Sequence, residues 1–291
     1  MNKISIIGLG AMGTAVANAF LKKDLTVTVW NRSPHKAQSL IARGAHHAIH
    51  IDEALGASSL LLISVLDYSA VQDIFHLVTD GHLDGKTVVN LTNGTPEEAR
   101  KMAAWVNAQG AAYIDGGIMV TPELIGQPNA FVLYSGAEDS FRAVESTLTI
   151  LGSPAYVGED PALAPLYDLS LLSAMFGMFG GFLHAAALLR SEAVPAAHGT
   201  PMIMSLLKAM IELFPEIAHE IDTREYPTPS SNNAMMATAL RNVLDGSREQ
   251  GVRDDLIEPV WQLFHQGVQN GQAARDISAL VPLLFMSHSA S

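Results

Sequence analysis

The sequence predicts an α/β protein: a doubly wound parallel sheet in the N-terminal half, one long helix, and an all-helical C-terminal domain. Short apolar runs alternate with helix-patterned segments, a glycine-rich turn follows the first run, and strand signals disappear after "GED" at Gly158–Asp160. Such alternation is typical of a parallel sheet covered by helices on both faces. We therefore expect a sheet domain over residues 1–160, an interdomain helix over 161–190 and a helical domain over 191–291.

The individual elements follow from local patterns. Runs of β-formers predict strands at Lys3–Ile7, Leu25–Trp30, Ser59–Val65, Lys86–Leu91, Ala112–Asp115 and Ala130–Tyr134. Helical periodicity predicts helices at Ala11–Lys23, Pro34–Arg43, Ser69–Val78 and Pro96–Ala108, with Gly44 and Gly110 as stop signals. A long helix over Pro161–Arg190 should precede helical segments near Thr200–Ile221 and Ser231–Asn270, separated by Pro227 and Pro229.

Composition excludes several classes of function. The net charge is −12 without any basic cluster, so a nucleic-acid partner is not expected. There are no cysteines, which removes disulfides and thiolate chemistry. Pro161–Leu189 is apolar and long enough to span a bilayer, but it contains Asp168 and His184 and lacks flanking basic anchors. We expect a buried helix there, no membrane association, and a cytoplasmic protein.

The stretch "IIGLGAMG" carries a G-x-G-x-x-G pattern at Gly8, Gly10 and Gly13. It ends a predicted strand and opens a predicted helix, which is the context of a dinucleotide-binding turn. Gly8 would permit the tight turn, Gly10 the approach of a pyrophosphate and Gly13 close helix–strand packing. The pyrophosphate would lie at the helix N-terminus, beside Ala11 and Met12. The alternative is a plain strand–turn–helix without a ligand.

The end of the second strand indicates which dinucleotide is bound. An NAD site would have Asp or Glu there for the ribose 2′-hydroxyl, but the sequence is "WNRSPHK". Arg32 and Lys36 are cations and Ser33 offers a hydroxyl, which together suit a 2′-phosphate. We predict NADP(H), with Asn31 in the same loop; a solvated basic turn is the alternative.

Other polar groups should gather at the carboxyl ends of the strands, where ligands bind in such sheets. Val65 and Leu66 end the third predicted strand and are assigned to the cofactor site. Asn93 follows the fourth strand and is the polar side chain best placed to reach a nicotinamide or a substrate. A helix-capping or turn role before Pro96 is its alternative.

The long helix contains one carboxylate in an almost entirely apolar run, Asp168. A buried carboxylate loses solvation, so its presence needs a reason. Leu172, Met175 and Phe179 fall within about 40° of the same helix face, and Phe176 lies about 80° around. That face would line an apolar pocket with one acid at its edge. Alternatively, Asp168 is a first-turn acid or the partner of a distant basic group.

Five stretches of the chain resemble the imine reductases, especially their reductive aminase subgroup, which are relatives of the β-hydroxyacid dehydrogenases. They are the glycine turn, "VWNRSPHKA", "NLTNGTPEEA", "IDGGIMVTPELIGQP" and "YDLSLLSAMFGMFGGFLHAAAL". The resemblance is specific from residue 1 to about 189 and looser beyond. It implies a Rossmann domain for dinucleotide binding, a helical domain for dimerisation and substrate binding, and an intertwined homodimer in which each helical domain completes the partner's active site.

The resemblance also implies an activity and site residues: NADPH-dependent reduction of imines to amines, with possible reductive amination of ketones by amines. By motif, the catalytic residues are Asn93 and Asp168. Many members have a tyrosine or aspartate eight residues after that acid, where this sequence has Phe176, which leaves the proton donor open. The substrate pocket is assigned to Met119, Val120, Leu172, Met175, Phe176, Phe179, Met235 and Met236.

Two other functions stay open on the sequence. A β-hydroxyacid dehydrogenase needs a lysine on the long helix, but no lysine occurs between Lys101 and Lys208. A non-catalytic NADP sensor would share the binding turn. A metal site is not predicted, because His46, His47 and His50 lack a recognised ligand spacing.

Overall fold

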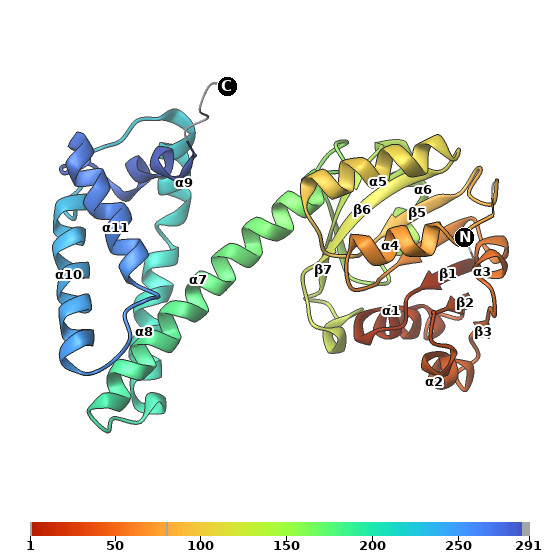
Figure 1. Cartoon of the computed structure of the whole chain (residues 1–291), viewed down its shortest axis with the longest axis horizontal. Coiled ribbons are helices and arrows are strands. Elements are labelled where there is room, and N and C mark those ends of the chain that lie inside the picture. Colours follow the sequence, from red (N-terminus) through yellow and green to blue (C-terminus); the bar gives the residue numbers. More distant parts are fainter. Residues whose placement is uncertain (1, 80, 287–291) are drawn as a thin grey trace. The chain divides into compact units, whose positions relative to one another are not determined.

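The computed structural model describes residues 2–79 and 81–286 (Figure 1). The chain divides into a sheet unit, Met1–Ser173, and a helical unit, Ala174–Ser291. The predicted fold class is confirmed: an α/β sheet domain comes first, a long helix follows it, and the remainder is helical.

One eight-stranded sheet forms the sheet unit, in the order β3-β2-β1-β4-β5-β6-β7-β8. The strands are β1 (Lys3–Ile7), β2 (Thr26–Trp30), β3 (His46–His47), β4 (Leu60–Ile63), β5 (Thr87–Asn90), β6 (Ala112–Ile118), β7 (Phe131–Gly136) and β8 (Ser153–Tyr156). All neighbours pair in parallel except β6 and β7, which are antiparallel, so the predicted parallel sheet contains one antiparallel pair. The edge strands β3 and β8 were not predicted.

Helices cover both faces of the sheet, because successive strand residues point to opposite sides and both sides are apolar. One core contains Ile4, Ile6 and Phe20, and includes residues of α1 (Ala11–Leu21), α2 (Gln38–Ile41) and α6 (Glu138–Leu148). The other contains Ile7 and Ile63, and includes residues of α3 (Ile51–Ala57), α4 (Tyr68–Phe75) and α5 (Pro96–Ala108). Short 3₁₀ turns η1 (Pro34–Ala37) and η2 (Pro122–Leu124) complete the unit.

The long helix α7 runs from Leu163 to Ser191. By length and composition it is apolar enough to cross a membrane, and only 6% of its most apolar 18-residue window is buried. The expectation of a buried helix is therefore not met within a single chain: Phe176 and Leu183 are each 63% exposed. The sequence pattern predicts an apolar helix, but it does not indicate which part of the protein covers that helix.

The helical unit continues with α8 (Ala196–Ile211), α9 (Phe214–Thr223), α10 (Asn233–Glu249), α11 (Glu258–Gly267) and the irregular turns η3 (Val268–Gln272) and η4 (Ile277–Leu284). The predicted segment Thr200–Ile221 is two helices, because Pro215 starts α9 and cannot continue α8.

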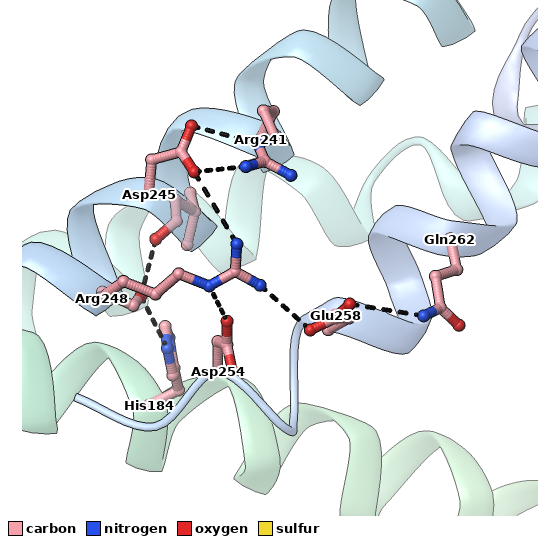
Figure 2. Close-up of polar contacts among 9 residues, drawn as sticks. His184, Arg241, Asp245, Arg248, Asp254, Glu258 and Gln262 are labelled. Carbon is pink, nitrogen blue, oxygen red and sulfur yellow. Dashed lines mark hydrogen bonds and ion pairs between the residues drawn. The ribbon is translucent and has the colours of Figure 1, made fainter. Parts of the chain in front are cut away.

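Polar contacts fasten α10 to the segment that leads into α11 (Figure 2). Arg248 donates to Asp254 (2.7 Å) and to Glu258 (3.2 Å). Ser247, which precedes Arg248 on α10, has its hydroxyl oxygen 3.2 Å from Nε2 of the buried His184 on α7. These contacts lie within the helical unit and fix its internal packing.

Candidate active site

The glycine-rich turn has the backbone that a dinucleotide site requires. Gly8 has φ +94°, and an added Cβ there would overlap the carbonyl oxygen of Ser64. A Cβ at Gly13 would overlap the carbonyl oxygen of Gly8, so this glycine permits close packing of α1 on the turn. Nothing lies within 4 Å of a Cβ built at Gly10, which leaves open space over the N-terminus of α1. No side chain caps that N-terminus, so its N–H groups are available to an anion.

The strand order places this turn at the switch point of the sheet. From β1 the chain proceeds to β2 and β3 on one side and then to β4 on the other, which leaves a crevice beyond the carboxyl ends of β1 and β4. A cavity of about 760 Å³ occupies this position. It is lined by Gly8, Leu9, Gly10, Ala11, Met12, Gly13, Trp30, Asn31, Arg32, Ser33, Lys36, Ser64, Val65, Leu66, Ala70, Asp73, Ile74, His76 and Leu77.

All residues predicted for the cofactor line this cavity, apart from Asn93. The cavity also has a wall that sequence reasoning missed, formed by α4 and the turn after it, with Asp73, His76 and Leu77. Nothing in the sequence marks these three residues, because they lie on a short helix and the turn after it and match no ligand-binding motif.

Asn31 connects the glycine turn to the basic loop. Its Oδ1 accepts the backbone N–H of Leu9 (2.9 Å), and its Nδ2 donates to the carbonyl of Ser33 (3.1 Å). Arg32 and Lys36 are exposed, and within the described residues neither makes an ion pair. Two exposed cations at the rim of a dinucleotide-sized cavity suit a 2′-phosphate.

The two predicted catalytic residues meet. The Nδ2 group of Asn93, on the loop between β5 and α5, donates a short hydrogen bond to Oδ2 of Asp168 on α7. The alternative role of Asn93 as a helix cap is taken by another residue: Thr95 caps α5 and forms a reciprocal capping box with Glu98. The Asn93 side chain is therefore committed to the carboxyl group.

Asp168 is buried, although its helix is otherwise largely exposed. It lies beyond the first turn of α7, so it is not a first-turn acid. Burial raises its pKa above the usual range, and the hydrogen bond from Asn93 opposes that rise. The backbone of Gly117 lies beneath it: a Cβ added at Gly117 would be 3.3 Å from the Asp168 Cβ and 3.1 Å from the Met119 Cε. Met119 is thus the predicted pocket residue that borders the pair.

The other predicted pocket residues are less enclosed within the single chain. Val120 and Leu172 are half-buried. Met175, Phe176 and Phe179 belong to the helical unit, as do Met235 and Met236 at the start of α10. Phe179 is 47% exposed and Met235 is 54% exposed, so these side chains form no closed pocket in this unit alone.

A buried polar cluster behind the Asn93–Asp168 pair was also missed. It consists of Tyr68, Asn90, Tyr113 and Asp115. Asp115 is a carboxylate within an otherwise uncharged strand, the same kind of signal that marks Asp168 on its helix.

Metal chemistry gains no support from this geometry. Among residues 2–79 and 81–286, no group of three or more His, Asp or Glu side chains is arranged to hold a metal ion. His46 and His47 form the edge strand β3, where successive side chains point to opposite faces.

Comparison with known proteins finds similar proteins for both parts of the chain. Residues 160–285 match the family described as "NADPH-dependent reductive aminase-like, C-terminal domain", and residues 3–158 match the "NAD binding domain of 6-phosphogluconate dehydrogenase". The NADPH-dependent reductive aminase of Aspergillus oryzae is 42% identical over 96% of this chain and 95% of its own length.

Solved structures are similar over nearly the whole chain. A reductive aminase from Aspergillus terreus in complex with NADPH4, cyclohexanone and allyl amine is 44% identical, with a TM-score of 0.92 over 98% of this chain and 99% of that chain. An imine reductase from Aspergillus terreus in complex with NADPH4 and dibenz[c,e]azepine is 44% identical, with a TM-score of 0.93 over 97% of this chain and 99% of that chain.

Proposed function

The chain belongs to the NADPH-dependent reductive aminase family and is an oxidoreductase that acts on C=N bonds with NADPH, and we propose that it does so at the Asn93–Asp168 pair. The observation that carries this proposal is a buried carboxyl group, fixed by an amide, at the same edge of the sheet as the dinucleotide cavity. The substrate would be an imine or iminium ion, and the product an amine.

The glycine turn and the basic loop would hold the cofactor. The N-terminus of α1 above Gly10 takes the pyrophosphate, and Arg32, Ser33 and Lys36 take the 2′-phosphate. When bound, NADPH supplies a hydride to the carbon of the C=N bond. The protein's own contribution is to orient the substrate and to stabilise its charge.

Asp168 is assigned the charge-stabilising role. An iminium substrate is a cation, and an ionised carboxyl group in a site with little water attracts it more strongly than it would in bulk solvent. Asn93 fixes the orientation of that carboxyl group and favours its ionised form, since it donates to the carboxylate oxygen.

Phe176 cannot supply a proton. In this chain the proton on the product nitrogen therefore comes from Asp168, from water or from the solvated amine. The raised pKa of Asp168 brings it closer to the range in which a carboxyl group exchanges protons near neutrality.

Reductive amination is the finer proposal for the substrate class. The similar reductive aminase from Aspergillus terreus was solved with a ketone and an amine together. We propose that this chain likewise accepts ketone and amine pairs, and that Met119, Val120, Leu172, Met175, Phe176, Phe179, Met235 and Met236 line the pocket that receives them.

We also propose a homodimer with intertwined helical domains, because the helical unit presents apolar side chains without cover. Met202 is 71% exposed, Leu206 62% and Phe214 59%, in addition to Phe176 on α7. Exposed apolar area of this extent is typical of an interface. A second copy would cover α7 and close the pocket around the exposed aromatic residues.

Within this architecture, residues 1–160 serve dinucleotide binding, 161–190 connect the domains, and 191–291 serve dimerisation and substrate binding. The protein would act in the cytoplasm, with neither membrane nor nucleic acid as a partner. Burial of α7 between two subunits accounts for its apolar surface without a bilayer.

Turnover assays test the proposal. Small cyclic imines, and ketone plus amine mixtures, are incubated with the protein and NADPH, and oxidation of NADPH is followed by absorbance while the amine is identified by mass spectrometry. Turnover of either class supports the proposal. Oxidation of a β-hydroxyacid with NADP⁺ and no imine reduction would favour the dehydrogenase instead, and NADPH binding without any turnover would favour a sensor.

A further inference from the structure

The buried polar cluster behind the candidate catalytic pair centres on Asp115 of β6, which is 1% exposed. Its Oδ2 accepts hydrogen bonds from the hydroxyl of Tyr113 (2.6 Å) and from the hydroxyl of Tyr68 on α4. Asn90, its register neighbour on β5, donates to the Tyr113 hydroxyl oxygen (3.0 Å). Two phenol hydroxyls therefore meet one carboxyl group, and Asn90 supports one of them.

Such a group is costly inside a domain. Burial raises the pKa of Asp115 to about 7, although the two phenol hydrogen bonds act in the opposite direction. The negative charge of Asp168 raises that pKa further. Asp168 therefore ionises at lower pH than Asp115. A residue that only filled the core here would be apolar, because an apolar side chain avoids the cost of burying a carboxyl group.

The first connection to the site runs through Tyr68. A Cβ added at Gly94 would overlap the Tyr68 ring, so the ring lies directly against the residue that follows Asn93. The hydroxyl bond to Asp115 fixes that ring at its far end.

A second connection runs through Tyr113. Asn90, which donates to the Tyr113 hydroxyl, also accepts the backbone N–H of Thr92 on its Oδ1 (3.1 Å). Thr92 immediately precedes Asn93. The loop that carries the catalytic amide is thus linked to Asp115 on both sides of Asn93.

A third connection is the strand itself. Gly117 lies two residues beyond Asp115 on β6 and therefore faces the same side of the sheet. Its missing side chain leaves room for Asp168. The strand that carries Asp115 is the surface on which Asp168 lies.

We propose that Asp115, held by Tyr68 and Tyr113, is a positioning residue of this active site, which fixes the Asn93 loop and, through it, the Asn93–Asp168 pair. The inference depends on the proposed function, since it assigns how the catalytic pair is oriented. It gives Asp115 no contact with substrate or cofactor.

The groups that face Asp115 determine whether its carboxyl group is ionised. They are Tyr68 from α4, Tyr113 from β6, Asn90 from β5 and Ser135, its register partner on β7, with the charge of Asp168 nearby. Within the described residues, no Lys, Arg or His forms an ion pair with Asp115. No cation in the described part of the chain therefore favours its ionised form, and with a pKa of about 7 Asp115 stays protonated at the lower pH at which Asp168 ionises.

The test is Asp115→Asn, which replaces the carboxyl group and retains the shape. NADPH affinity should be unchanged, whereas kcat for a cyclic imine should fall about 10- to 100-fold, because small misplacement of a catalytic group has effects of that size. Introduced together with Asp168→Asn, it should cause little further loss, since it acts through the Asn93–Asp168 pair. If Asp115→Asn yields no folded protein, Tyr113→Phe decides, with a smaller fall in kcat and unchanged NADPH affinity.

Tyr134→Phe is the matched control. Tyr134 is fully buried in the neighbouring strand β7, and within the described residues its hydroxyl has no hydrogen-bond partner. It should leave both kcat and the NADPH affinity unchanged. The inference would be overturned if Asp115→Asn had the same kcat as this control. It would also be overturned if Asp115→Asn lowered kcat by the same factor in the wild-type background and in the Asp168→Asn background. A wild-type protein that reduces no imine contradicts the proposed function instead.

Discussion

Replacement of Asp168 by asparagine separates catalysis from structure. The amide oxygen of the new side chain can still accept the hydrogen bond from Asn93, and its size still fits above Gly117. The fold and the NADPH cavity should therefore persist, while the charge that stabilises an iminium ion is lost. A positioned acid–base group contributes about 10²–10⁴-fold. We expect kcat to fall by that factor, which corresponds to about 2.7–5.4 kcal/mol at about 1.36 kcal/mol per tenfold change.

Stability should change in the opposite direction. The pKa of Asp168 is higher in the folded chain than its usual value of 3.8, so the folded state binds the proton more tightly than the unfolded state. The contribution of this group is complete below its unfolded pKa and is lost as pH rises through its folded pKa. At neutral pH the ionised group is thus unfavourable in the fold, and Asp168→Asn should maintain or increase the melting temperature.

Three measurements check these expectations together. NADPH oxidation with a cyclic imine gives kcat, fluorescence titration gives the NADPH dissociation constant, and differential scanning fluorimetry at pH 5 and 8 gives the melting temperature. Full turnover in Asp168→Asn would refute the catalytic assignment. A loss of NADPH affinity equal to the loss of turnover would show instead that the residue maintains the cofactor site.

Three further predictions concern cofactor choice, the proton donor and assembly. Arg32→Ala or Lys36→Ala should raise the Michaelis constant for NADPH far more than that for NADH, because only NADPH carries the phosphate; equal increases for both cofactors would displace the 2′-phosphate site. Phe176→Tyr should raise imine reduction, or change the handedness of the amine measured by chiral chromatography, because it adds a hydroxyl at a position where many family members have a polar group. No change in that variant would exclude this position from proton transfer. Light scattering at micromolar concentration should give a dimer mass, and Leu206→Asp should shift it toward monomer because a charge would be buried at the interface; a monomeric wild-type protein would contradict the intertwined architecture.

Central elements of the fold were predicted well because their patterns are strong. The strand Lys3–Ile7 and the helix Pro96–Ala108 occur with the predicted bounds. The first is a run of isoleucines interrupted only by Ser5 after its opening lysine, and the second has a capping box and a proline at its start. Both missed strands, His46–His47 and Ser153–Tyr156, are the edges of the sheet. Edge strands are short and half-exposed, so their residues lack an apolar signature.

Strand direction was predictable in part. No helix was predicted between β6 and β7, and the structure has only the 3₁₀ turn Pro122–Leu124 there. A parallel connection needs a crossover, usually a helix, so the missing helix indicates an antiparallel pair. The missed helix Glu138–Leu148 buries Phe141, Val144 and Leu148 at helical spacing, a pattern that the sequence does contain.

The sequence identified the members of the candidate site better than their neighbours. Asn93 and Asp168 are 75 residues apart, and only the fold brings the two side chains into contact. The contact of Tyr68 with Asp115 is equally non-local, and the contact of Tyr113 with Asp115 lies within one strand. No rule of sequence spacing connects either contact to Asn93. Exposure of α7 could not be predicted at all, because composition is the same whether a second subunit or the chain itself covers a helix.

The fastening of the Asn93 loop has a consequence for substrate affinity. On one side Thr92 is bound to the Asn90 side chain, and on the other Thr95 closes the reciprocal cap of α5. The conformational entropy of this loop is therefore given up when the chain folds, before any ligand arrives. A substrate that binds beside Asn93 does not have to order the loop, so more of its interaction energy remains for affinity and for the transition state.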